Sequence, residues 1–190
     1  MKKLFLLVSF RKMNKVRRAW IWLSRVGHCM GFGIQSPTDY RFVCYVINER
    51  WPYYAYETLG TQDDWQKRKL GRLYFRIANY LQPSQIIDMV EAKEYLNAAC
   101  SKALIPQKNT ALGEQTKVEL AIVPIQSEYQ QLFSWCDEGS VVVFENIYQQ
   151  SELWHCIQHD PRTTVTFDLY YCGIVFFDKS RYSHHYQINF

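Results

Sequence analysis

Six residues of this sequence have side chains that could bind a ligand or transfer a proton. Acids and an amide come directly after short apolar runs at four positions: Asp88, Glu91, Glu145 and Asn146. Open α/β folds bind ligands beyond the carboxyl ends of their strands, so these four are candidate ligand-binding residues. His28 stands beside a glycine-rich loop and is a candidate base, and Tyr54 could belong to an aromatic wall for a ligand.

Each candidate also has a purely structural interpretation. Asp88 could cap the N-terminus of the helix that follows it, and Glu145 and Asn146 could form an ordinary turn from strand to helix. His28 could satisfy backbone groups of its loop, and Tyr54 could help to pack N-terminal helices on a sheet. No metal site is expected, because no two Cys or His residues stand at ligand spacing near a second such pair.

Residues 1–82 predict an N-terminal helical region. Apolar residues recur at helical spacing over 13–26 and would form one face, made of Val16, Ala19, Trp20, Leu23 and Val26. Ser36 is placed to cap a second helix that runs up to Arg50. A third helix over 63–81 would bury a face made of Leu70, Leu73, Tyr74, Ile77 and Leu81.

Residues 83–190 predict an α/β core in the same single domain. Strands are expected over 85–90, 118–123, 140–144, 163–171 and 173–177, with 186–190 extending the last strand. Helices are expected over 91–104, 127–136 and 149–159. Strands that alternate with helices indicate a mostly parallel sheet covered on both faces, here ending in an antiparallel pair of C-terminal strands.

The composition indicates a folded protein. The chain has 190 residues, of which 48% are hydrophobic and 21% charged, as expected for one globular domain. The formal net charge is +4, and the basic residues before Asp39 could bind phosphate, although such runs are usually solvated helix faces. The scattered cysteines are typical of free thiols in a reducing compartment, and no apolar run reaches the ~18 residues of a membrane span. We therefore expect a cytoplasmic protein without a membrane partner.

Several segments resemble a known protein family. They are GIQSP at 33–37, PYYAY at 52–56, LGRLYFRIANYLQPSQIID at 70–88, SVVVFENI at 140–147, TVTFDLYYCGIVFFDK at 164–179 and HYQINF at 185–190. These segments are similar to small bacterial proteins of the class I S-adenosylmethionine-dependent methyltransferase superfamily, related to O-methyltransferases. The resemblance implies a Rossmann-like methyltransferase sheet. It also implies that any cofactor would lie beside Asp88 and Glu91, and that Glu145 and Asn146 are the remnant of a substrate or metal site.

Three departures from that family affect the cofactor region. The turn after the first strand reads MVEAKE at 89–94, so it lacks the glycines that let a backbone approach the cofactor. Glu91 and Glu94 would also place negative charge beside a carboxylate ligand. The stretch between Asp88 and Glu119 is too short for the two strands that the family has there, so one edge of the sheet is expected to be reduced. Pro124 replaces an aspartate of the family.

These departures favour a degenerate, non-catalytic methyltransferase-like protein that acts as a binding or interaction module without a cofactor. One alternative is an active O-methyltransferase that binds S-adenosylmethionine at an atypical site. Another is a nucleic-acid-associated protein that uses the basic N-terminal helix, which we do not favour. An uncovered sheet edge would promote pairing with a second copy, so a homodimer is a further expectation.

Overall fold

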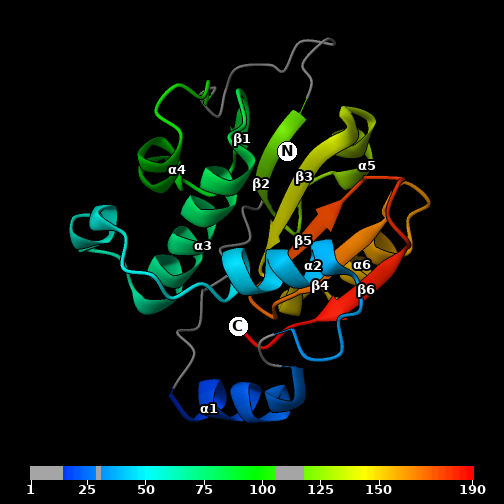
Figure 1. Cartoon of the computed structure of the whole chain (residues 1–190), viewed down its shortest axis with the longest axis horizontal. Coiled ribbons are helices and arrows are strands. Elements are labelled where there is room, and N and C mark those ends of the chain that lie inside the picture. Colours follow the sequence, from blue (N-terminus) through cyan, green and yellow to red (C-terminus); the bar gives the residue numbers. More distant parts are fainter. Residues whose placement is uncertain (1–14, 29–30, 106–117) are drawn as a thin grey trace, which may run out of the picture.

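The computed structural model describes residues 15–28, 31–105 and 118–190, and these residues form an α/β fold. A six-stranded mixed sheet lies at the centre and helices cover both of its faces (Figure 1). The strands lie in the order β1-β2-β3-β5-β4-β6. They are β1 (Ile86–Asp88), β2 (Val118–Pro124), β3 (Cys136–Glu145), β4 (Val165–Asp168), β5 (Cys172–Phe176) and β6 (His184–Gln187).

The sheet is parallel apart from one strand. β1, β2 and β3 pair in parallel, whereas β5 runs antiparallel to both of its neighbours, β3 and β4. β6 pairs in parallel with β4 and forms the second edge. The predicted mostly parallel sheet with an antiparallel C-terminal pair is therefore confirmed. The expectation that 186–190 extends β5 is wrong, because that segment contributes instead to the separate edge strand β6.

The helices connect the strands and supply the two outer layers. They are α1 (Lys15–Ser24), α2 (Pro37–Phe42), α3 (Trp65–Leu81), α4 (Lys93–Ala99), α5 (Tyr129–Ser134) and α6 (Ser151–Gln158). Short 3-10 helices lie at Val26–His28, Tyr54–Glu57 and Ile147–Gln149, and a π-helix at Val43–Ile47. The second predicted helix thus begins at Pro37 but changes to the wider π form after Phe42 and ends at Ile47. The helix predicted over 91–104 is also shorter, since it ends at Ala99.

Helix α3 is the best-defined element of the N-terminal region. Asp64 caps its N-terminus, where the Asp64 carboxylate accepts a hydrogen bond of 2.9 Å from the Lys67 amide. At the other end Gln82 takes a left-handed conformation with φ 48°, which ends the helix before Pro83. Leu70, Leu73, Tyr74 and Ile77 are buried as the sequence predicts.

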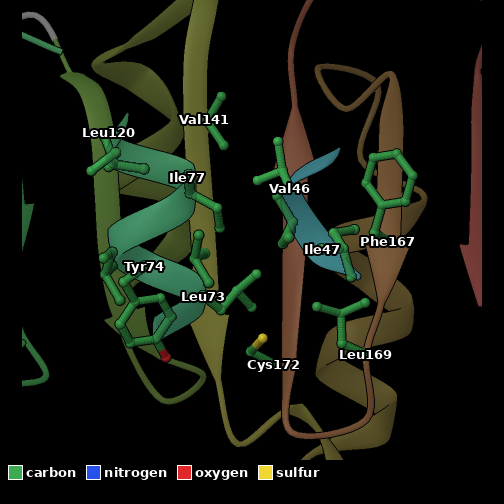
Figure 2. Close-up of a cluster of buried hydrophobic side chains, with 14 of the residues drawn as sticks. Val46, Ile47, Leu73, Tyr74, Ile77, Leu120, Val141, Phe167, Leu169 and Cys172 are labelled. Carbon is green, nitrogen blue, oxygen red and sulfur yellow. The ribbon is translucent and has the colours of Figure 1, made fainter. Parts of the chain in front are cut away.

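The core has one half on each face of the sheet, because side chains of a strand alternate between the faces. On one face, Leu73 and Ile77 lie near the strand residues Leu120 and Val141, and Val46 and Ile47 belong to the same buried cluster on the side of Phe167, as Figure 2 shows. On the other face, α5 and α6 contribute Phe133 and Trp154, which pack with Phe144 and Val175. This two-sided burial explains why β2 and β3 read as continuous apolar runs in the sequence.

The prediction for the first helix is correct in type but wrong in its buried face. Val16, Trp20, Leu23 and Val26 were expected to face the core, but all four are exposed, Trp20 by 71%. The helix is instead fixed by Ile21, which is buried, and by Arg25, whose Nη2 donates a 2.7 Å hydrogen bond to Asp168 Oδ1. A salt bridge to the end of β4 thus replaces the expected apolar contact.

Cys100 and Cys172 are buried free thiols, as expected, whereas the free thiol of Cys156 is exposed. Cys29 lies outside the described residues. Among the residues that the structure describes, no helix is both long and apolar enough to cross a membrane.

Candidate functional site

Asp88 lies at the carboxyl end of β1, where ligands of open α/β folds bind, but its side chain turns back on its own chain. Asp88 Oδ1 accepts a hydrogen bond of 3.0 Å from the Val90 amide. Burial raises the pKa of the Asp88 carboxyl, while the backbone N–H groups of Val90, Ala92 and Glu91 act in the opposite direction. The carboxylate therefore serves as a cap for the turn between β1 and α4.

Glu145 lies at the end of β3 and is held by a tyrosine of α3. The Tyr74 hydroxyl donates a hydrogen bond of 2.5 Å to Glu145 Oε1. Burial raises the pKa of Glu145, the Tyr74 hydrogen bond lowers it, and the negative charge of Asp88 raises it further. The pKa of the buried Tyr74 is itself raised by burial and then by the charge of Glu145. The site thus joins two acids and a phenol whose pKa values all lie above their ordinary values.

Asn146 completes this acidic cluster from the next position. It takes a left-handed conformation with φ 61°, and its backbone N–H donates a 2.7 Å hydrogen bond to the Tyr171 carbonyl. Its Oδ1 accepts a hydrogen bond of 3.3 Å from Gln66 Nε2, a second contribution from α3. The backbone N–H and the side chain of Asn146 are thus both hydrogen-bonded to other parts of the fold.

The space beyond β1 is packed with side chains. Ala92 is buried in the core and Val90 packs against it. Farther along, Tyr95 of α4 lies so close to α3 that a Cβ atom at Gly71 would stand 2.4 Å from its ring. The Tyr95 hydroxyl donates a 2.7 Å hydrogen bond to Asp63 Oδ2. Glu91 takes a left-handed conformation with φ 63°, which a glycine would adopt with less strain.

The structure brings Asp88, Glu145 and Asn146 to the carboxyl ends of the strands, but it does not place His28 or Tyr54 with them. His28 is exposed, and its carbonyl accepts a hydrogen bond from the Asn189 amide. Tyr54 is 92% exposed on a 3-10 helix, so it does not form part of a wall. No group of three metal-binding side chains is found among the described residues.

Sequence reasoning missed the parts of α3 that close this edge. Tyr74 was assigned to an apolar face, and its spacing gave no sign that its hydroxyl reaches Glu145. Gln66 lies four residues before Leu70, near the start of the helix, and its polar side chain suggested an exposed position. Two cavities open beside α3, and neither is lined by Asp88, Glu91, Glu145 or Asn146.

Comparisons with models of protein families, with curated proteins and with solved structures found no match to this chain. The α/β fold and the geometry of the sheet edge therefore carry the functional argument alone.

Proposed function

We propose that this chain is a degenerate relative of the class I methyltransferases that has lost catalysis and acts as a binding module. One observation carries the proposal: the place where a cofactor would bind, at the carboxyl ends of β1 and β3, is occupied by the protein's own groups. Tyr74 holds Glu145, and Asp88 caps its own turn.

Electrostatics supports the same conclusion. The carboxyl groups of Asp88 and Glu145 both have a pKa raised first by burial, so the site accommodates further negative charge poorly. The carboxylate of S-adenosylmethionine would have to approach both acids, although the positive charge of Lys67 acts against the raised pKa of Glu145. A non-catalytic role also agrees with Glu91, which takes a left-handed conformation without being glycine.

The arrangement of the strands supports descent from a methyltransferase sheet. In the described residues β1 is an edge strand, as expected if the strands that would lie beyond it are reduced. Among the described residues, an isolated parallel bridge between Gln85 and Leu104 lies beside it. Homodimerisation through the uncovered edge of β1 remains a prediction. Light scattering after size-exclusion chromatography would test it, and the measured mass should be that of two chains.

The direct test is calorimetric titration with S-adenosylhomocysteine, the demethylated product that methyltransferases retain well. We expect no binding heat and no change in melting temperature at millimolar ligand, because a single occupied site would add roughly 2.7 kcal/mol of stability at 100 times its dissociation constant. Saturable binding that is lost in Asp88→Asn but retained in the surface variant Lys179→Met would contradict the proposal and favour the active methyltransferase.

A further inference from the structure

Two adjoining cavities lie between α1, α3 and residues 189–190, and neither is lined by Asp88, Glu145 or Asn146. The first has a volume of 440 Å³ and the second 390 Å³. They share four lining residues, Trp22, Trp65, Lys69 and Phe190, so they form one continuous groove. We call it the α1–α3 groove. Asn189 Nδ2 donates a 3.2 Å hydrogen bond to the Trp22 carbonyl and so ties one wall to the other.

The first cavity is strongly cationic. Its lining contains five basic residues, Arg50, Arg68, Lys69, Arg72 and Arg76, against one acid, Glu49. Glu49 is itself engaged, since its Oε2 accepts a 2.7 Å hydrogen bond from the Tyr53 hydroxyl. Arg68 and Arg76 donate to backbone carbonyls, which hold the guanidinium groups in place without neutralising their charge. The lining of the first cavity therefore carries an excess of positive charge that is held in place.

Two buried donors in this cavity have no hydrogen-bond partner among the described residues. They are Nδ2 of Asn48 and Nε of Arg72. Buried donors are almost always paired in proteins, so two such atoms in one cationic cavity indicate an acceptor that the chain does not supply. Burial and the charges of Arg18 and Arg76 lower the pKa of Lys69 to about 8, although the thiol of Cys172 opposes them. A bound anion would relieve this repulsion.

The second cavity combines aromatic and basic residues. Its lining contains Trp22, Trp65, Tyr171 and Phe190 together with Ala19, Ile21, Lys15, Arg18 and Lys69. Arg18 stacks on the Trp65 ring at 3.5 Å, whereas Trp22 is 51% exposed. A cationic compartment joined to an aromatic one matches a ligand that is anionic at one end and flat at the other.

We infer that the α1–α3 groove binds a nucleoside phosphate, with the phosphate against Lys69, Arg72 and Asn48 and the base on Trp22. The same chemistry is offered by a free nucleotide and by a single-stranded nucleic acid. None of Asp88, Glu145 and Asn146 lines the groove, so the inference does not depend on the loss of catalysis.

The test is calorimetric titration at low salt with AMP, adenosine and inorganic phosphate, alongside anisotropy of a fluorescein-labelled oligoadenylate. AMP should bind more tightly than either of its parts, because both compartments contribute. Arg72→Met and Arg50→Met each remove one positive charge from the groove and should weaken AMP binding by about tenfold. Trp22→Leu removes the ring under the base and should weaken it to a similar extent. The control variants Lys179→Met and Asp88→Asn should bind like the wild type. Melting curves of every variant show that it is folded, and Arg50 is exposed enough for its variant to fold normally.

The outcomes separate clearly. Tight AMP binding assigns the groove to a free nucleotide, and binding of the oligonucleotide alone assigns it to a strand; both support the inference. The inference is overturned if neither probe binds, if phosphate binds as tightly as AMP, or if Arg50→Met and Trp22→Leu leave affinity unchanged. It is also overturned if Asp88→Asn abolishes AMP binding, because AMP would then lie at the acidic sheet edge.

Discussion

The two faces of α3 border regions of opposite character. Toward the sheet, Tyr74 and Gln66 reach Glu145 and Asn146 and close the place where an open α/β fold would bind a ligand. On the other face, residues at helical spacing such as Arg68, Lys69 and Arg72 line an open cationic groove. One helix therefore closes one potential site and builds another. The comparison teaches that one helix can pack closely against strand ends and still border an open groove.

The largest effect is expected from a variant that overpacks the contact between α3 and α4. In Gly71→Ala a new Cβ would lie 2.4 Å from the Tyr95 ring, which cannot move freely between α3 and α4. Overpacking of this kind costs about 1–3 kcal/mol, so we expect a clear loss in denaturant unfolding. Gly139→Ala is the matched control, because its Cβ would meet nothing nearer than 3.5 Å. Equal stability of the two variants would show that α3 and α4 are not closely packed.

Removal of the Tyr74 hydroxyl tests the closure itself. Tyr74→Phe leaves the half-buried Glu145 without its 2.5 Å donor, and we expect a loss of about 1–3 kcal/mol at neutral pH. Tyr80→Phe is the control on the same helix, since Tyr80 is 54% exposed. Urea unfolding of both variants measures the difference. Similar stabilities would mean that the Tyr74 hydroxyl is not bound to Glu145.

The pH dependence of stability tests the charge of the closed edge. The pKa of Glu145 is raised by burial above its ordinary value of 4.5, so the folded state holds this proton more tightly than the unfolded state. The resulting stability is complete below pH 4.5 and is lost as the pH rises through the folded-state pKa. Glu145→Gln should therefore gain stability relative to the wild type over that rise. A constant difference between their unfolding free energies from pH 4 to 7 would contradict a raised pKa.

The smallest change in stability is expected at the C-terminal end of α3. Gln82 ends this helix at φ 48°, and Gln82→Gly should stabilise the protein by about 0.5–1 kcal/mol because glycine adopts this conformation without strain. The measurement is a thermal melt, with AMP titration beside it. Nucleotide affinity should not change, since Gln82 lines neither cavity. A lower melting temperature would contradict this account of the helix end.

The sequence predicted the fold better than the site. Periodicity located α3 and the apolar strands because their burial is decided by local pattern, as at Leu73 and Val142. It failed for α1, where the long-range salt bridge between Arg25 and Asp168 decides the orientation and leaves Trp20 exposed. Such a contact leaves no periodic signal. The apolar strand pattern placed Asp88 at the end of β1, as the structure has it, but nothing local revealed that the Tyr74 hydroxyl would bond to Glu145.

The account depends most on that closure, and the most direct measurement is a crystal structure of the protein soaked with S-adenosylhomocysteine and AMP together. We predict that residues 88–94 keep their packing with no ligand beside them, and that AMP lies in the α1–α3 groove against Trp22. Density for S-adenosylhomocysteine between Asp88 and Glu145, with Tyr74 displaced, would contradict the central claim.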